Sequence, residues 1–222
     1  MSRRIRALVF DFDGLILETE MPALQSWMEI YREYGHEVPI DRWHTYLGSD
    51  RGFEPVEHLA ALVGEGLDRE ATQRRRDRRK DELIAALDVM EGVRDYIGDA
   101  RRLGLRLAIA SSSSRAWVLG HLERLGLATG WDVVRTRNDV ARTKPAPDLY
   151  LSTVEALGVR PCEALALEDS PNGIAAAKSA GLSCIAVPNA LTEGMDLSGA
   201  DLRIRALSAT PLEAVLARLP PY

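Results

Sequence analysis

The feature that most constrains the fold is a series of short apolar segments, each followed by acidic, hydroxyl or lysine residues. The first segment, residues 6–10, reads Arg-Ala-Leu-Val-Phe and is typical of a buried strand. Further strand-like segments cover residues 105–110, 131–135, 164–167 and 183–187, and helical patterns cover residues 94–103, 114–125, 147–157, 171–180 and 211–218. Strands that alternate with helices of about ten residues predict an α/β fold, in which a parallel sheet carries helices on both faces.

The pattern changes between the first strand and the later ones. From about residue 19 to residue 87, helical periodicity dominates and β-branched residues are sparse. Pro39, Gly64 and Gly66 divide this stretch into separate helices. We therefore expect three to five packed helices without a strand. They would form an all-helical domain over residues 18–88, inserted into a core domain made of residues 1–17 and 89–222.

Composition argues against some classes of partner. The chain has 222 residues, of which 46% are hydrophobic, so it can bury a sizeable core. Its formal net charge is −5, and no overall basic excess favours binding to nucleic acid. A basic cluster at residues 73–80 lies within a helical pattern and has acids on either side. We interpret this cluster as a solvated helix face, with local anion binding as the alternative.

The sequence favours a reducing, aqueous compartment. Cys162 and Cys184 lie far apart and show no metal-ligand spacing, so we expect neither a disulfide nor a zinc site. The arginine-rich start at residues 1–14 contains an apolar run too short for a signal peptide. No segment approaches the roughly 20 apolar residues of a membrane span. We expect a cytoplasmic protein without membrane contact.

Chemically active residues gather where the predicted strands end. They are Asp11 and Asp13 after the first strand, Ser111 to Ser114 after the second, Lys144 in the loop after the third, and Glu168 and Asp169 after the fourth. Ligands of open parallel sheets bind beyond the carboxyl ends of the strands, so we expect these side chains to share one rim.

This set of side chains has a common chemical logic. Carboxylates that converge in one place repel each other unless a cation lies among them, and hard oxygen ligands suit Mg²⁺. Hydroxyl groups and free N–H groups at a helix N-terminus can hold an anion, and Lys144 can neutralise both a carboxylate and a phosphate oxygen. The combination predicts a site for phosphoryl transfer, in which a carboxylate can act as the nucleophile.

The same residues resemble the sequence motifs of the haloacid dehalogenase-like superfamily. The four matching segments are Asp11-Phe12-Asp13-Gly14-Leu15-Ile16, Ala110-Ser111-Ser112-Ser113, Lys144-Pro145-Ala146-Pro147-Asp148 and Leu167-Glu168-Asp169-Ser170-Pro171-Asn172-Gly173. The helical insertion lies where the cap domain lies in the subgroup that contains β-phosphoglucomutase and sugar-phosphate phosphatases. The resemblance covers nearly the whole chain and implies a Rossmann-like core with a helical cap.

The resemblance also implies a role for each matched residue. Asp11 would be the nucleophile and a metal ligand, and Asp13 the general acid and base, with its backbone carbonyl on the metal. Ser111, Ser112 and Ser113 would hold the phosphoryl group, and Lys144 would steady both Asp11 and the phosphate. Asp169 would bind Mg²⁺ directly, and Glu168 would bind the metal or its water.

Two positions separate the reaction classes. Dehalogenases of the superfamily lack the second aspartate, so Asp13 argues against dehalogenation. β-Phosphoglucomutases carry a histidine at the place of Ala23, so its absence favours water as the final acceptor. Glu18 stands where relatives usually have aspartate, and we expect a changed local hydrogen bond without loss of activity.

The cap should choose the substrate because it closes over the leaving group. By resemblance, Glu20 would contact sugar hydroxyls, and Arg51, in a cap loop that reaches into the site, would bind a second anionic or hydroxyl-rich part of the substrate. An exposed arginine at a helix start is the alternative for Arg51. We therefore expect a monomeric, Mg²⁺-dependent phosphatase that acts on a small phosphate ester such as a sugar phosphate. A phosphosugar mutase and a non-catalytic phospho-ligand-binding relative are the alternatives.

Overall fold

A six-stranded parallel sheet forms the centre of the protein. The computed structural model describes residues 5–46 and 53–219, and the strands lie in the order β3-β2-β1-β4-β5-β6. Their bounds are Ala7–Phe10 (β1), Arg106–Ala110 (β2), Val133–Arg135 (β3), Ala164–Glu168 (β4), Ser183–Ala186 (β5) and Leu202–Arg203 (β6). Every neighbouring pair in this sheet is parallel, which confirms the predicted α/β class.

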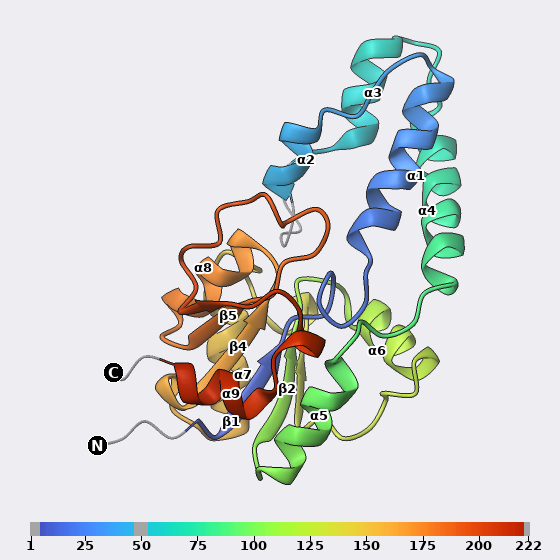
Figure 1. The fold of residues 1–222 in the computed structure, drawn as a ribbon. Helices are drawn as coiled ribbons and strands as arrows, with labels where there is room; N and C mark the ends of the chain where they lie inside the picture. The colour runs from blue at the N-terminus through green and yellow to red at the C-terminus, as the bar shows by residue number, and fades with distance from the viewer. Residues whose placement is uncertain (1–4, 47–52, 220–222) are drawn as a thin grey trace.

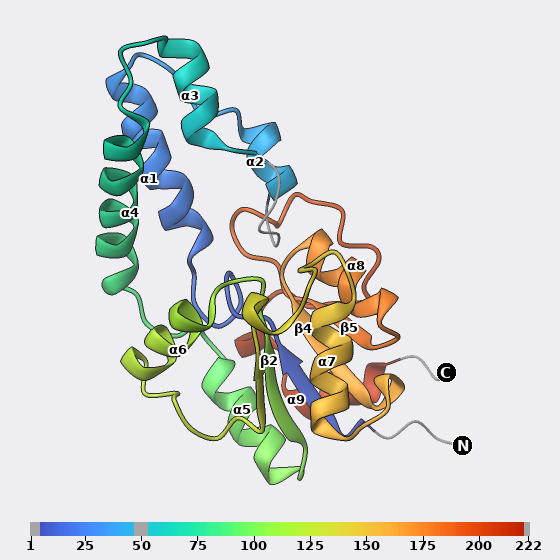
Figure 2. The ribbon, with the colours of Figure 1, turned by 180° about the vertical axis from the view of Figure 1, so that it is seen from behind.

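Helices cover both faces of the sheet (Figures 1 and 2). They are α5 (Val93–Arg102), α6 (Arg115–Arg124), α7 (Asp148–Leu157), α8 (Pro171–Ser179) and α9 (Leu212–Arg218). Leu8 and Phe10 of β1 point into a cluster with residues of α5, α6 and α9, whereas Ala7 and Val9 point into a cluster with α7 and α8. Because side chains alternate along a strand, each of these short strands contributes to two hydrophobic cores.

The predicted elements of the core agree with the structure to within two residues at each end. The exception is β6, which no sequence pattern predicted. It has only two residues, neither of which is buried, and one of them is Arg203, so it lacks the apolar run that marks most of the other strands. Short 3₁₀ turns at Arg137–Asp139 (η1), Pro161–Glu163 (η2) and Leu207–Ala209 (η3) were not predicted either.

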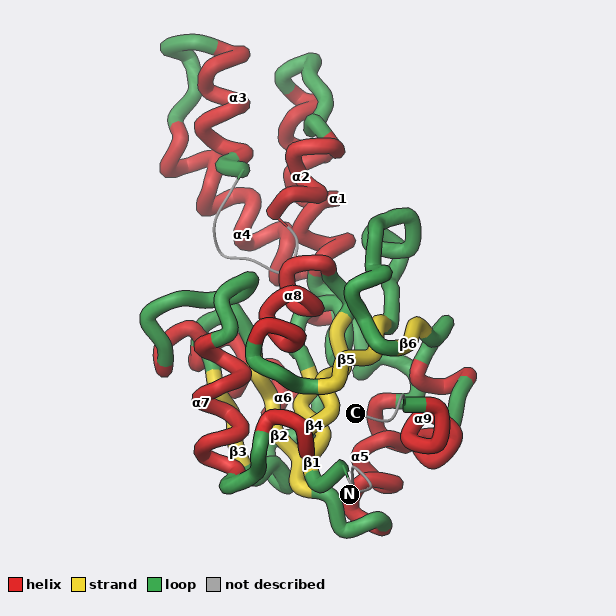
Figure 3. Tube along the Cα trace, turned by 90° about the vertical axis from the view of Figure 1, so that its left-hand side faces the viewer, coloured by secondary structure: helices red, strands yellow, loops and turns green. Residues whose placement is uncertain are grey.

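Between residues 20 and 85, the regular elements that the structure describes are all helices. They are α1 (Glu20–Glu33), α2 (Ile40–Tyr46), α3 (Pro55–Val63) and α4 (Arg69–Ala85). They enclose a hydrophobic cluster of their own, which includes Trp27, Tyr31, Trp43 and Leu59. Figures 1 and 3 show this group beyond the carboxyl ends of the strands, over the rim of the sheet.

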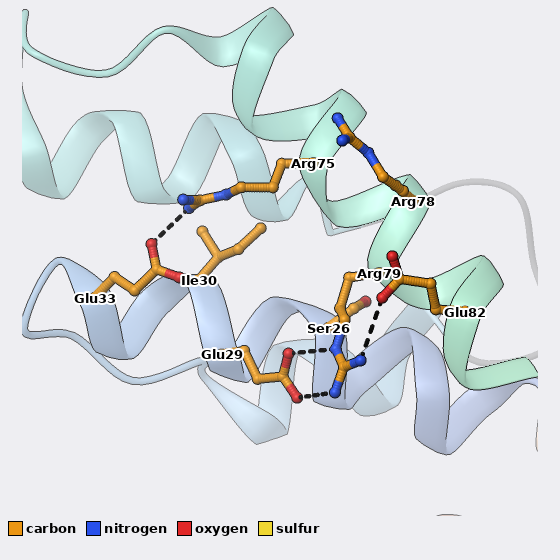
Figure 4. A pocket seen from close by; sticks show the side chains of 8 residues that line it. All are labelled: Ser26, Glu29, Ile30, Glu33, Arg75, Arg78, Arg79 and Glu82. Atoms are coloured by element: carbon orange, nitrogen blue, oxygen red, sulfur yellow. Dashed lines mark hydrogen bonds and ion pairs between the residues drawn. The ribbon is translucent and has the colours of Figure 1, made fainter.

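The basic cluster of α4 is tied to α1. Arg79 binds the carboxylate of Glu29 with Nε at 2.8 Å and Nη2 at 3.2 Å, and Arg75 lies 2.8 Å from Glu33. Between these ion pairs runs a groove of about 300 Å³ (Figure 4). Arg75 and Arg79 therefore join the two helices through charge pairs, which the interpretation of the cluster as a solvated face did not include.

Two further observations concern the cysteines and the length of the helices. Neither Cys162 nor Cys184 is part of a disulfide within the part of the chain that the structure describes. Among the described residues, the structure contains no helix of the length and apolarity that crossing a membrane requires.

Candidate active site

The loop that leaves β1 brings Asp11 and Asp13 to the carboxyl edge of the sheet. The Asp11 N–H donates to the Leu167 carbonyl at 3.0 Å, which continues the pairing of β1 with β4. Gly14 then turns the chain with φ of +78°, and a Cβ built on it would lie 2.4 Å from Oδ2 of Asp169. Only glycine combines this backbone angle with so close an approach to the carboxylate.

Lys144 links the nucleophile candidate to Glu168. Its Nζ lies 2.6 Å from Oδ1 of Asp11 and 2.6 Å from Oε1 of Glu168, and the residue is only 1% exposed. Burial disfavours the ammonium charge, but the two carboxylates outweigh it and raise the pKa of Lys144. Lys144 therefore stays charged and holds the Asp11 carboxylate in one orientation.

Tyr150 is a member of this network that sequence reasoning missed. Its hydroxyl donates to the same oxygen of Glu168 that receives Lys144. Glu168 itself is the last residue of β4, where the sequence placed it just after the strand. No sequence signal marked Tyr150, because an apolar position in α7 fits it equally well.

The side chains of Asp11, Glu168 and Asp169 form a buried group whose ligand oxygens lie within 4.8 Å of one another. Burial and the neighbouring Glu168 raise the pKa of Asp11 to about 7, although Lys144 opposes the shift. Burial, with Asp11 and Glu168, also raises the pKa of Asp169 well above its usual range. The carboxylates therefore outnumber the positive charge that Lys144 supplies.

This group fits a hard divalent cation. Oδ1 of Asp169 and Oε2 of Glu168 are buried and accept no hydrogen bond within the protein, although buried polar atoms normally have a partner. A cation among the carboxylates would satisfy these oxygens and relieve the repulsion. Asn189, which the sequence gave no reason to select, donates from Nδ2 to Oδ2 of Asp169 at 2.7 Å and so fixes the other oxygen.

Asp13 lies in a separate set of hydrogen bonds. Its Oδ1 accepts from the Thr19 hydroxyl at 2.9 Å and from Nε1 of Trp117 at 2.8 Å. Its Oδ2 accepts from the hydroxyls of Ser113 at 2.6 Å and Ser111 at 3.3 Å. No motif in the sequence marked Trp117, although its indole N–H contacts the candidate acid.

The serine segment joins β2 to α6 and lies at the same edge. The Ser111 hydroxyl accepts from the backbone N–H of Ser113 at 3.0 Å, and Ser112 lies between them, partly exposed. Ser114 caps α6, since its hydroxyl accepts from the backbone N–H of Trp117 at 3.2 Å. The segment thus caps α6 through Ser114 and places the hydroxyls of Ser111 and Ser113 on Asp13.

Residues at the start of α1 face the rim from the helical side. Glu18 accepts from the backbone N–H groups of Glu20 and Met21 at 3.0 and 3.1 Å, so its carboxylate caps the first turn of α1. Shielding from water and the negative charge of Asp13 raise the pKa of Glu20 to about 8. Arg51 and the rest of its loop lie outside the described residues.

Sequence comparison connects this arrangement to known proteins. The model of the family "Haloacid dehalogenase-like hydrolase" matches residues 8–187. The chain is 40% identical to YhcW of Bacillus subtilis, which is named as a phosphatase, over 97% of this chain and 98% of YhcW. It is 28% identical to the β-phosphoglucomutase of Bacillus subtilis over 94% of this chain and 93% of that protein.

Comparison with solved structures also finds a similar protein. A crystal structure of mutant CbbY from Rhodobacter sphaeroides, in complex with xylulose 1,5-bisphosphate, superimposes with a TM-score of 0.71. The two chains are 30% identical, and the match covers 92% of this chain and 95% of CbbY.

Proposed function

The chain belongs to the haloacid dehalogenase-like hydrolase family, and from this premise we propose that it hydrolyses the phosphate monoester of a small, sugar-like molecule through a phosphorylated Asp11. The observation that carries the proposal is the position of Asp11. Asp11 is buried between the ammonium of Lys144 and the carboxylates of Glu168 and Asp169. A carboxylate nucleophile therefore lies beside a positive charge and a group that can hold a cation, and phosphoryl transfer needs both.

Four groups of the chain would hold a magnesium ion: the side chains of Asp11, Glu168 and Asp169 and the backbone carbonyl of Asp13. When bound, Mg²⁺ supplies the positive charge that offsets these carboxylates and draws electron density from the phosphoryl oxygens. The unpartnered oxygens of Asp169 and Glu168 support this assignment.

The first step transfers the phosphoryl group to Asp11. An oxygen of Asp11 bonds to phosphorus while the bond from phosphorus to the ester oxygen breaks. Asp13 gives a proton to the departing oxygen, so that the product leaves as an alcohol. Lys144 holds Asp11 in line, and the hydroxyls of Ser111 and Ser113 can turn from Asp13 to the phosphoryl oxygens.

The second step returns the enzyme to its starting state. Asp13, now deprotonated, takes a proton from water while the water oxygen bonds to phosphorus. The bond between phosphorus and Asp11 breaks, and inorganic phosphate leaves. Over the two steps Asp11 and Asp13 regain their starting states, and the net reaction consumes one water and releases an alcohol and inorganic phosphate.

Hydrolysis is favoured over a mutase reaction by the start of α1. Ala23 offers no side chain that could hold or exchange a proton with a sugar hydroxyl, where resemblance places a histidine in the mutases. The similarity to a β-phosphoglucomutase keeps the mutase as the alternative, because that relative shares nearly the whole fold.

A hydroxyl-rich substrate is supported by Glu20. Its carboxylate lies near Asp11 and Asp13 on the helical side, and a pKa of about 8 lets it accept or donate hydrogen bonds to hydroxyl groups near neutral pH. The complex of the CbbY relative with a sugar bisphosphate supports the same class. The phosphoryl group would lie on Asp11 and the sugar below α1.

The test is a phosphate-release assay with Mg²⁺ on hexose, deoxyhexose and pentose phosphates, phosphoglycolate and β-glucose 1-phosphate. Release that requires Mg²⁺ and disappears in Asp11→Asn supports the proposal, and the ranking of esters gives the substrate class. Conversion of β-glucose 1-phosphate to glucose 6-phosphate with little free phosphate would favour the mutase. Ester binding without turnover would favour a non-catalytic relative.

We also propose that the enzyme works as a monomer in the cytoplasm. The position of helices α1 to α4 over the rim of their own chain supports the monomer. Light scattering at assay concentration tests the monomer, and a mass of twice 24.5 kDa would contradict it.

A further inference from the structure

We propose that Trp117 positions the general acid Asp13 through its indole N–H, an inference that depends on the function proposed above. The indole Nε1 donates to Oδ1 of Asp13 at 2.8 Å. Trp117 is only partly buried, and it lies in α6, next to the serine segment that also contacts Asp13.

The chemistry of the donor assigns different roles to the two oxygens of Asp13. An indole N–H can only donate, so Oδ1 facing it must remain an acceptor. The hydroxyls on Oδ2, from Ser111 and Ser113, can both donate and accept. The proton that Asp13 passes to the leaving group is therefore carried by Oδ2, while Trp117 anchors Oδ1.

The indole is itself held in place from two other sides. Nζ of Lys80 lies 4.2 Å from the centre of the Trp117 ring, within the range of a cation–π contact. The His121 ring meets it edge to face, with the centroids 4.3 Å apart, and also stacks against Phe12. The direction of the N–H is thus fixed before a substrate arrives, which is what positioning requires.

Lys80 makes this contact a link between the helical group and the core. It belongs to α4, whereas Trp117 belongs to α6, and Figures 1 and 2 show the end of α4 running down towards α6. The side chain of Lys80 is 19% exposed and lies close enough to Asp13 for their opposite charges to interact. The ammonium therefore holds the indole against Asp13 from the side of the helical group.

The test compares two esters that need a general acid to different extents. Trp117→Phe keeps an aromatic ring and removes the N–H. For the best sugar phosphate of the panel, whose alkoxide leaves poorly without a proton, we expect kcat/KM to fall by about 10- to 100-fold, a part of the usual contribution of an acid. For p-nitrophenyl phosphate, whose leaving group needs no proton, we expect a loss below about threefold.

A matched control is available in the same protein. Trp131 donates its indole N–H to the Leu127 carbonyl at 2.9 Å, away from the carboxylates. Trp131→Phe makes the same chemical change and should leave the ratio of the two kcat/KM values unaltered. Equal losses on both esters in Trp117→Phe, or no loss on the sugar phosphate, would overturn the proposal.

A second measurement does not depend on turnover. In ¹⁵N-labelled protein, the Trp117 indole resonance is assigned by its absence in Trp117→Phe, and Asp13→Asn should shift it more than the Trp131 resonance. An unmoved Trp117 signal would mean that the bond does not exist. Retained activity in Asp11→Asn would instead refute the phosphatase and leave this result intact.

A third variant covers the case in which Trp117→Phe does not fold. Benzothienylalanine at position 117 replaces the N–H by sulfur in a ring of nearly the same shape. It should reproduce the selective loss on the sugar phosphate, and wild-type rates on both esters would overturn the proposal.

Discussion

The ammonium of Lys144 lies 2.6 Å from Oδ1 of Asp11, and both groups are almost completely buried. Removing one partner of such a pair leaves a buried charge without compensation, which costs about 3–5 kcal/mol. We expect Lys144→Met to lower the free energy of unfolding by this amount and to abolish phosphate release, as measured by denaturant unfolding and the ester assay.

Lys178 provides the control for that change. Its Nζ lies 2.6 Å from Oδ1 of Asp201, but a third of its side chain is exposed, so the pair is worth at most about 1 kcal/mol. Lys178→Met should therefore leave kcat unchanged. A stability loss as large as that of Lys144→Met would show that burial does not distinguish the two pairs.

Asp169→Asn should raise the thermal stability of the protein without magnesium and reduce the stabilisation that magnesium provides. In EDTA, removing one of the converging carboxylates relieves their repulsion, so we expect Tm to rise. With Mg²⁺ the wild-type protein should gain stability in proportion to ligand binding, whereas the variant should gain little. Thermal unfolding at several Mg²⁺ concentrations measures both, and a variant that Mg²⁺ stabilises as strongly as wild type would rule out Asp169 as a ligand.

The metal-free protein should lose stability as pH rises. The pKa of Asp11 is raised from 3.8 to about 7 and that of Glu20 from 4.5 to about 8, so the folded protein binds more protons than the unfolded chain between these values. These groups make their full contribution to the free energy of unfolding below about pH 4, and this contribution is lost by about pH 8.

Glu20→Gln checks the origin of this slope. The variant removes one of the carboxyl groups whose pKa is raised in the folded protein, so its stability should fall less steeply between pH 5 and pH 8, by about the share of one carboxyl group. Unfolding by urea in EDTA at fixed ionic strength gives the comparison. A profile that rises with pH for the wild-type protein would contradict the assigned environments.

Gly14→Ala should damage the site beyond its backbone strain. The new Cβ would lie 2.4 Å from Oδ2 of Asp169 and 2.7 Å from Nδ2 of Asn189. Gly35 has a similar φ, +74°, with no atom within 4 Å of the added carbon, so Gly35→Ala measures the backbone cost alone, about 1–2 kcal/mol. We expect Gly14→Ala to lower the free energy of unfolding by more than Gly35→Ala does, and to weaken Mg²⁺ binding. Denaturant unfolding with and without Mg²⁺ measures both, and equal losses in the two variants would mean that the loop at Gly14 adapts.

The sequence predicted the groups that lie directly at strand ends. Asp11, Lys144 and Asp169 follow apolar runs or stand in short loops, so the parallel sheet alone brings them to one edge. Their partners were not predictable in the same way. Tyr150 and Trp117 lie on helices whose apolar patterns explain them equally well as packing residues.

The contacts that the sequence did not predict depend on how distant segments of the chain face each other. The Trp117 indole reaches Asp13 only because α6 returns against the first loop, and Asn189 reaches Asp169 only from the loop after β5. No local pattern encodes where such a side chain points. The helical stretch was predictable from periodicity, but the ion pairs between α1 and α4 depend on how the two helices face each other.

The most direct test of the central claim is to trap the phosphorylated enzyme. Wild-type protein with Mg²⁺ is mixed with a ³²P-labelled sugar phosphate, quenched in acid within the first turnover, digested and examined by mass spectrometry. We expect the label on the peptide that contains Asp11 and none in Asp11→Asn. Release of phosphate with a label on another residue would contradict the role of Asp11 as the nucleophile.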